Sequence, residues 1–206
     1  MRHLILSVSL ILATACSRNS GAGPSPSPSP MSTPSKETSE MPAKPADPAT
    51  DFILESADFT EGQPIPKVHA YHGEGKNTPP RLAWRNLPKG TIELALIMDD
   101  PDAPTPEPWV HDVLYHIPVD ATPDLMVIRG VSVMSASRFT AGTNSWNELG
   151  WGGPKPPPGK PHRYFFRLYA LDAHLELAPG ATKAQLLAVM KGHVLGTAQL
   201  MGTYQR

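Results

Sequence analysis

Residues 92–117, IELALIMDDPDAPTPEPWVHDVLYHI, contain two strand-like segments separated by a proline-rich connection. Ile92–Met98 is an apolar run of strand length, and Trp109–Ile117 is rich in aromatic and β-branched residues and ends before Pro118. Because alternate residues of a strand share a face, period two groups five residues of the second segment: Trp109, His111, Val113, Tyr115 and Ile117. This stretch predicts two β-strands joined by a loop.

Further strands are expected towards the C-terminus. Arg163–Leu171 is a third strand-like segment, and Ala198–Tyr204 is expected to close the chain as a last strand. One side of the third strand carries His162, Tyr164, Phe166, Leu168 and Ala170. The stretches 101–108 and 150–161 are dense in proline and glycine, so they are expected to be loops.

One helix is expected between the last two strands. Thr182 followed three residues later by Gln185 is a capping-box signature. Helical spacing then continues through Leu186, Leu187, Met190 and Val194. The sequence shows no repeated βαβ pattern, which argues against a Rossmann fold or a TIM barrel. The predicted fold class is therefore mainly β and antiparallel, with a C-terminal helix.

Composition and charge narrow the class of protein. The chain has 206 residues, of which 25 are prolines, and this excess excludes a helix bundle or coiled coil because proline disrupts helices. Residues 51–206, expected to form one domain, carry 14 Lys and Arg against 16 Asp and Glu. This nearly neutral balance lacks the excess of Lys and Arg that is typical of nucleic-acid-binding domains. A single cysteine excludes a disulfide within the chain.

The first 50 residues have the pattern of a targeting signal followed by a tether. Residues 1–15 place an arginine, an apolar run and small residues in the order of a secretory signal. Cys16 follows as in the lipobox of bacterial lipoproteins, although Ala13 replaces the usual leucine. The preferred interpretation is a lipid-anchored protein of the bacterial cell envelope, facing the periplasm or exterior; the alternative is an ordinary cleaved signal. Residues 16–50 are expected to be a disordered Pro/Ser-rich spacer.

Two histidines and a group of carboxylates are candidates for chemistry. Asp99, Asp100 and Asp102 place three mutually repelling carboxylates at the end of a strand, where a solvated turn is the plainer interpretation. His111 and His162 lie in or at the start of strands, so each is either a satisfied core histidine or a functional one. The residue pattern alone leaves both alternatives open.

Five motifs follow one another along the domain. They are Thr78-Pro79-Pro80 with Leu82-Ala83-Trp84; Asp100-Pro101-Asp102-Ala103-Pro104; Trp109-Val110-His111; Gly142-Thr143-Asn144-Ser145; and Gly153-Pro154 continuing through His162-Arg163-Tyr164 to Leu168-Tyr169-Ala170-Leu171. In this order, Phe52–Arg206 resembles the phosphatidylethanolamine-binding protein family, specifically its bacterial Raf-kinase-inhibitor-like branch. One motif alone would be weak, whereas five in order are a strong signal.

The resemblance implies an antiparallel β-sandwich with a small cavity that binds anions. Carried over position by position, Asp100, His111 and His162 line this cavity, and the ligand-binding residues around it are Trp109, Gly153, Pro154 and Tyr164. A carboxylate beside an imidazole favours imidazolium, so the histidines are expected to bind a phosphate, a phospholipid head group or a carboxylate through charge-assisted hydrogen bonds. No cofactor and no resident metal are implied. The natural ligand and the oligomeric state are not indicated.

The sequence departs from the family pattern at three positions. Asp112 stands where many relatives carry tryptophan, and Tyr71 and Lys155 stand where bacterial relatives often carry cysteines. Any link that those cysteines make in relatives is therefore absent. Pro108 is predicted to follow a cis peptide bond, because relatives have unusual peptide geometry near this point.

Two functions from different classes fit these residues. The first is a non-enzymatic module with a small anion pocket, held outside the cytoplasm by a lipid anchor. The second is a metal-assisted hydrolase in which Asp100, His111 and His162 form a facial triad. The sequence favours the binding module, because a metal would require both histidines to be neutral and no helical motif fixes the ligands. An envelope interaction protein with a vestigial pocket is a third alternative.

Overall fold

The computed structural model describes residues 51–120 and 139–206. The predicted signal, the lipidation site at Cys16 and the spacer lie outside these residues. The described elements are β1 (Ile53–Ser56), a 3₁₀ turn (Lys67–His69), β2 (Leu82–Arg85), β3 (Glu93–Asp100), β4 (Trp109–Pro118), β5 (Thr140–Ala141), β6 (His162–Leu171), α1 (Lys183–Met190) and β7 (Val194–Tyr204).

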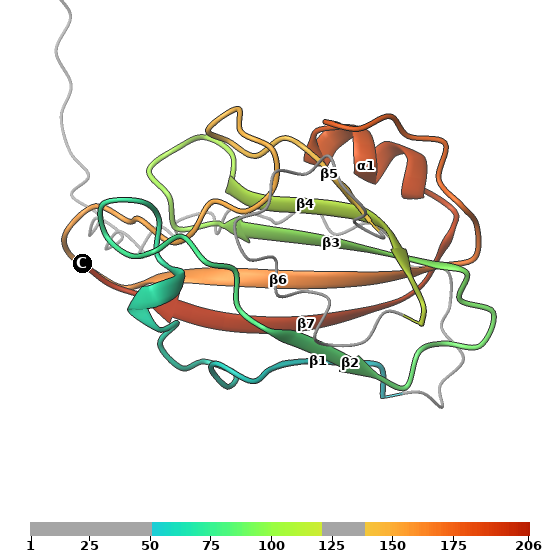
Figure 1. Ribbon diagram of the computed structural model, residues 1–206, viewed down its shortest axis with the longest axis horizontal. Coiled ribbons are helices and arrows are strands. Elements are labelled where there is room, and N and C mark those ends of the chain that lie inside the picture. The colour runs from blue at the N-terminus through green and yellow to red at the C-terminus, as the bar shows by residue number, and fades with distance from the viewer. Residues whose placement is uncertain (1–50, 121–138) are drawn as a thin grey trace, which may run out of the picture. The chain divides into compact units, whose positions relative to one another are not determined.

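The strands form two antiparallel sheets (Figure 1). The larger has the order β5-β4-β3-β6-β7, and β1 pairs with β2 in the smaller. One core cluster joins the small sheet to the large one, through Leu54 and Leu82 against Leu96 and Phe166. A second cluster joins the opposite face of the large sheet to α1, through Ile97 against Leu186. The predicted antiparallel β fold with a C-terminal helix is confirmed.

Strand β4 does not keep a regular alternation. Its pairing with β3 shifts register at two points, and His116 has a positive φ of 55°. Val113 and Tyr115 consequently pack in the cluster that contains α1, whereas Leu114 and Ile117 pack in the cluster between the sheets. The single common face predicted for this strand is wrong, because bulges interrupt the period of two.

The capping box of α1 is present as predicted. The Thr182 hydroxyl accepts from the Gln185 amide, and the Gln185 side chain accepts from the Thr182 amide. The helix ends at Met190, and Gly192 has a φ of +87°, a conformation that favours glycine. Val194, predicted to continue the helical spacing, instead begins β7, because the chain reverses at this glycine and pairs with β6.

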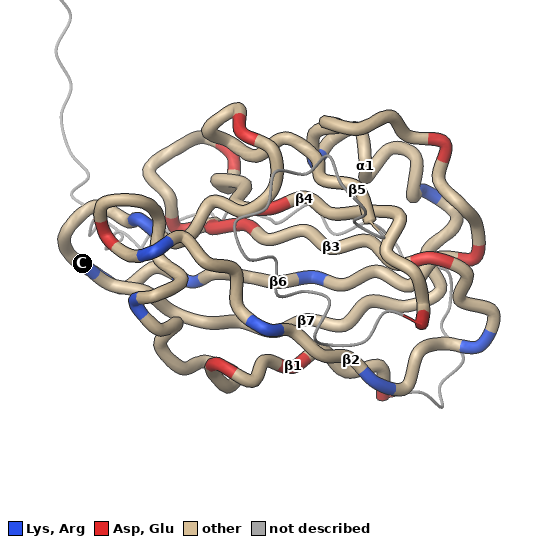
Figure 2. Tube along the Cα trace, viewed as in Figure 1, with Lys and Arg blue, Asp and Glu red and all other residues tan. Residues whose placement is uncertain are grey.

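Helix α1 is also tied to the sheet by a buried ion cluster. The Asp99 carboxylate, which is fully buried, accepts from the Arg167 guanidinium at 2.8 Å and from the Lys183 ammonium at 2.5 Å. Asp99 points to the helix side of β3, so its neighbour Asp100 is directed to the other side. Elsewhere acidic and basic residues are interspersed along the described chain (Figure 2). None of its described helices is long and apolar enough to cross a membrane.

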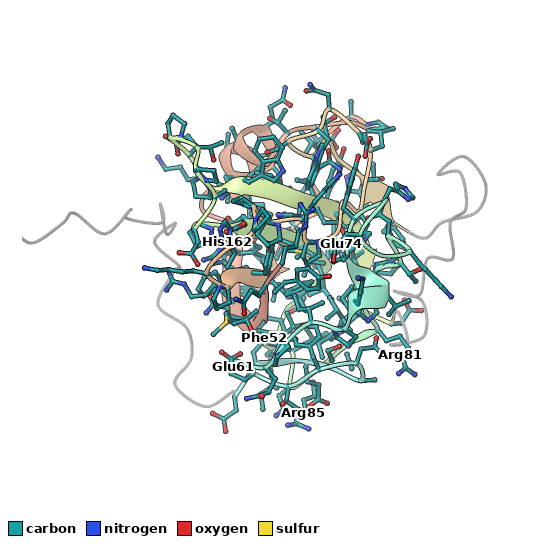
Figure 3. All side chains as sticks on the ribbon, turned by 90° about the vertical axis from the view of Figure 1, so that its left-hand side faces the viewer. Phe52, Glu61, Glu74, Arg81, Arg85 and His162 are labelled. Carbon is teal, nitrogen blue, oxygen red and sulfur yellow. The ribbon has the colours of Figure 1, made fainter. Side chains whose placement is uncertain are left out.

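The end of the domain at which His162 lies is held together by the C-terminus. Glu74 accepts from the Tyr204 hydroxyl at 3.0 Å and pairs with Arg206 at 3.2 Å. Figure 3 views the molecule from this end, with Glu74 and His162 labelled. The Gln205 side chain donates to the Gly159 carbonyl at 2.7 Å. These contacts tie the C-terminus to the segment that carries Glu74 and to the 150–161 loop, which contributes to the candidate site.

Candidate functional site

A cavity of about 340 Å³ lies where the C-terminal end of β3 meets the start of β4 and β6. Its wall is made of Asp100, Ala103, Pro104, Thr105, Trp109, His111, Trp146, Lys155, Pro156, Pro157, His162 and Tyr164. The structure therefore brings together five of the seven predicted site residues. Both proline-rich loops contribute to the wall, as the sequence pattern indicated.

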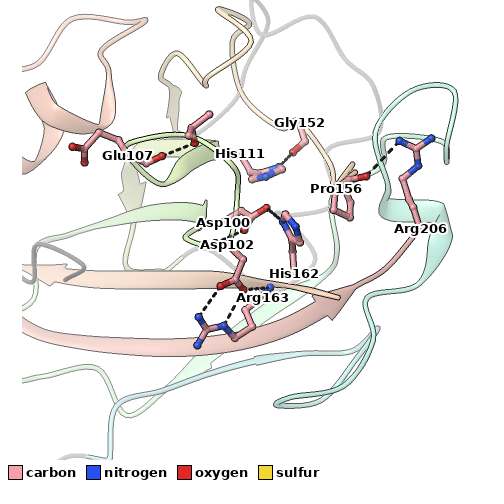
Figure 4. Close-up of polar contacts among 10 residues, drawn as sticks. Asp100, Asp102, Glu107, His111, Gly152, Pro156, His162, Arg163 and Arg206 are labelled. Atoms are coloured by element: carbon pink, nitrogen blue, oxygen red, sulfur yellow. Dashed lines mark hydrogen bonds and ion pairs between the residues drawn. The ribbon is translucent and has the colours of Figure 1, made fainter. Parts of the chain in front are cut away.

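Asp100 and His162 form the central polar pair of the cavity (Figure 4). The His162 Nδ1 atom lies 2.7 Å from Asp100 Oδ2, and the Asp102 amide donates to Asp100 Oδ1 at 2.8 Å. Burial raises the pKa of Asp100 above its ordinary value, although the hydrogen bond to His162 opposes that shift. Both carboxylate oxygens thus have a partner, and the pair orients the His162 ring.

Asp102 has a different role from Asp100. Its carboxylate accepts from the Arg163 guanidinium at 2.8 and 2.9 Å and from the Arg163 amide at 2.9 Å (Figure 4). These bonds join the loop after β3 to the start of β6, so they hold His162 beside Asp100. Asp102 does not line the cavity.

His111 contacts backbone and aromatic groups instead of a carboxylate. Its Nδ1 atom lies 2.6 Å from the Gly152 carbonyl oxygen, and the edges of the ring meet Trp146 and Tyr164. The residue is only 2% exposed, and burial lowers the pKa of His111 to about 4. The expectation of two imidazolium groups is therefore wrong at His111, because desolvation disfavours the charged ring and Asp100 pairs with His162.

Two buried hydrogen-bond donors of the cavity wall have no partner among the described residues. They are the Trp109 indole N–H and the Tyr164 hydroxyl. Burial, and after it the charge of Asp100, raises the pKa of Tyr164. Unpaired buried donors cost free energy, so their shared position in one wall distinguishes this cavity from an ordinary surface hollow.

Gly153 and Pro154, predicted to lie around the cavity, are not part of its wall. The Gly153 amide donates to the Asn77 side chain at 2.7 Å, and the Pro154 carbonyl accepts from the Tyr71 amide at 3.0 Å. A side chain on Gly153 would collide with the His69 carbonyl. These residues dock one loop against another behind the wall, because their backbone polar groups are needed for that contact.

Trp146 and Lys155 belong to the cavity but were not among the predicted site residues. Tyr71 stacks on Trp146 with a centroid distance of 4.5 Å, and the Lys155 ammonium lies 5.0 Å from the centre of the Tyr71 ring. Trp146 directly follows the motif Gly142-Thr143-Asn144-Ser145, which was the one available signal. Lys155 is exposed at the rim, so it adds a permanent positive charge at the entrance.

The peptide bond before Pro108 and the side chain of Asp112 are two further features near the site. The described residues contain no cis peptide bond, so the predicted cis bond before Pro108 is wrong. The Thr105 hydroxyl donates to the Glu107 carbonyl at 2.7 Å (Figure 4), and this turn leads into β4 with trans bonds alone. Asp112, which departs from the family pattern beside His111, is buried, and burial raises its pKa to about 7.

The geometry gives little support to a metal triad. Among residues 51–120 and 139–206 no three histidine, cysteine, aspartate or glutamate residues are grouped as a metal site. Asp100 and His162 hydrogen-bond each other, and His111 uses Nδ1 for Gly152. Asp100 is therefore engaged by His162 and by the Asp102 amide, and it is not grouped with both histidines as the predicted facial triad would require.

The fold and the cavity define a small antiparallel β-domain with an aromatic-walled polar site at one end of its larger sheet. The model of the phosphatidylethanolamine-binding protein family matches residues 55–205. This match covers more than half of the chain, and the chain belongs to that family.

Relatives and solved structures agree with this assignment. A UPF0098 protein of Methanothermobacter thermautotrophicus is 46% identical over 142 residues, covering 66% of this chain and 88% of the relative. The UPF0098 protein YbhB of Escherichia coli is 30% identical over 155 residues, or 73% and 98% of the two chains. The crystal structure of E. coli YbcL, described as a member of the mammalian PEBP family, matches with a TM-score of 0.67 and 29% identity, covering 75% of this chain and 98% of YbcL. The crystal structure of a Chlamydia trachomatis protein, described as a putative phosphatidylethanolamine-binding protein homologue, matches with a TM-score of 0.63 and 35% identity. The match covers 75% of this chain and 97% of the C. trachomatis chain.

Proposed function

We propose that the protein is a non-enzymatic binding module whose cavity holds a small oxyanion, such as a phosphoryl or carboxylate group. The observation that carries this proposal is the pair of buried donors, Trp109 and Tyr164, that line one cavity without a partner among the described residues. An oxyanion offers several acceptor lone pairs, so one ion can accept hydrogen bonds from donors on different strands.

Charge at the rim supports the same ligand class. Lys155 is the one lysine or arginine among the described residues of the cavity wall. His162 hydrogen-bonds the Asp100 carboxylate, so it is not a second free cation beside Lys155. Neutral donors hold the anion in the interior, while the Lys155 ammonium attracts it at the entrance, where salt screens the attraction.

The test is a calorimetric titration of the purified protein with inorganic phosphate and with acetate. Tyr164→Phe removes one interior donor and retains the ring, and we expect it to weaken binding by about tenfold. Lys155→Met is expected to weaken binding by a few-fold at low salt and less at high salt. Lys160→Met, an exposed lysine of the same loop outside the cavity wall, is the matched control. Equal affinity in Tyr164→Phe and wild type would count against the proposal.

The proposal includes the location of the protein. Residues 51–206 form the binding domain, and the family match over 55–205 supports that division. Residues 1–15 act as a signal, Cys16 carries lipid, and residues 16–50 hold the domain away from the bacterial membrane. The resemblance to YbhB and YbcL supports the Raf-kinase-inhibitor-like branch. Incorporation of labelled fatty acid that is lost in Cys16→Ser tests the anchor; unlabelled wild-type protein would contradict it.

A further inference from the structure

We infer that the cavity selects an oxyanion that carries an O–H group, such as hydrogen phosphate, over a fully deprotonated oxyanion such as sulfate. The selection comes from His111, which presents the ligand with a hydrogen-bond acceptor. This inference rests on the proposed oxyanion-binding function and adds the chemical class of the ligand.

The position of the proton on His111 follows from its backbone partner. The His111 Nδ1 atom lies 2.6 Å from the Gly152 carbonyl oxygen (Figure 4). A carbonyl oxygen only accepts hydrogen bonds, so Nδ1 carries the proton. In a neutral ring the other nitrogen, Nε2, then has a lone pair and accepts. His111 lines the cavity and Gly152 does not, so we infer that the Nε2 edge of the ring faces the cavity.

The surroundings of His111 keep the ring neutral. The residue is 2% exposed and lies edge-on to Trp146 and Tyr164. Its hydrogen-bond partner is the Gly152 carbonyl, whereas the Asp100 carboxylate pairs with His162. Burial lowers the pKa of His111 to about 4, although the charge of Asp99 acts in the opposite direction.

A neutral acceptor in the wall discriminates between oxyanions of the same shape. An unprotonated oxygen placed against Nε2 would put two lone pairs together, whereas a protonated oxygen donates a hydrogen bond to it. Inorganic phosphate keeps at least one O–H at neutral pH, and sulfate has none. The donors Trp109, Tyr164 and His162 can serve the remaining oxygens of either ion, so His111 makes the difference.

The experiment compares phosphate with sulfate on the purified protein at pH 7 and equal ionic strength. We expect phosphate to bind at least about tenfold more tightly, the factor that one unpaired buried acceptor produces. His111→Gln introduces an amide that can donate, so the preference should fall to within about twofold. His174→Gln, at the opposite end of β3 where the exposed ring pairs with Glu93, is the matched control and should retain the preference.

A second measurement needs no variant. Nitrogen-15 NMR of the wild-type imidazoles should show His111 protonated at Nδ1 and unprotonated at Nε2 at pH 7. A His111 ring protonated at Nε2, or equal affinity for phosphate and sulfate, would overturn the inference while leaving oxyanion binding intact. Binding of neither ion, nor of acetate, would instead contradict the proposed function itself.

Discussion

The Lys155 ammonium lies 5.0 Å from the centre of the Tyr71 ring. This cation–π contact connects the 150–161 loop to the segment that follows the 3₁₀ turn. Tyr71 stacks in turn on Trp146 of the cavity wall. The connection between the loops therefore positions the rim cation of the cavity.

Removing the Tyr71 ring should weaken anion binding without direct contact to the anion. In Tyr71→Ala the lysine loses its aromatic partner and Trp146 loses its stack, so we expect phosphate affinity to fall by roughly three- to tenfold. Tyr71→Phe keeps the ring and loses only the hydroxyl bond to Glu148, so its affinity should stay near wild type. Calorimetric titration measures both; a Tyr71→Phe loss equal to that of Tyr71→Ala would show that the ring is not responsible.

Asp112 should make stability depend on pH. Burial raises its pKa from the ordinary 3.8 to about 7, so the native state binds more protons than the unfolded state between these values. The free energy of unfolding therefore falls as pH rises from about 4 to about 7 and changes no further from this group above that range. Asp112→Asn should remove this loss, gaining about 4 kcal/mol relative to wild type between pH 4 and pH 8.

Urea denaturation at several pH values measures the Asp112 effect. Glu176→Gln, an exposed acid distant in sequence from the site, serves as the control and should run parallel to wild type. A constant difference between Asp112→Asn and wild type at every pH would mean that Asp112 titrates normally.

The buried ion cluster of Asp99, Arg167 and Lys183 should contribute far more to the free energy of unfolding than an exposed ion pair does. Asp99→Asn leaves the buried Arg167 without its charged partner, and we expect a loss of about 3–5 kcal/mol in the free energy of unfolding. Glu55→Gln breaks the exposed pair with Arg85 and should cost no more than about 0.5 kcal/mol. Comparable losses in the two variants would be inconsistent with the buried position of Asp99.

Gly153→Ala should loosen the loop behind the cavity. The added methyl group would meet the His69 carbonyl, so either this backbone or the 150–161 loop must move. We expect about 1–3 kcal/mol of destabilisation and weaker phosphate binding, because the displaced loop carries Lys155. Thermal denaturation together with titration measures both effects, with exposed Lys160→Ala as the control. Unchanged melting and binding would show that the contact relaxes freely.

The strands could be predicted from sequence because burial imposes a visible period. β6 keeps strict alternation from His162 to Ala170, so its inward residues were identified correctly. β4 was identified as a strand, but the residues on each of its two faces were not. A bulge with a positive φ at His116 has no clear sequence signature in this segment. Helix α1 was predicted from its capping box, whereas its end depended on the turn at Gly192.

The residues of the site could be predicted from sequence only where they belong to a family motif. Asp100, His111, His162, Trp109 and Tyr164 converge as the resemblance implied. Trp146 and Lys155 join them through a stack with Tyr71, which lies far away in the sequence, so no local pattern could reveal it. The neutral state of His111 depends on burial and on the Gly152 carbonyl, and both are products of tertiary structure.

The most direct test of oxyanion binding follows the Trp109 indole N–H by NMR during a phosphate titration. The Trp109 and Trp151 indole nitrogens are both buried without a partner among the described residues, but only Trp109 lines the cavity. We predict a saturable downfield shift of the Trp109 indole proton as it donates to the anion, with the Trp151 signal unchanged. A Trp109 signal that stays in place up to saturating phosphate, in protein shown to be folded, would contradict the proposal that this cavity binds oxyanions.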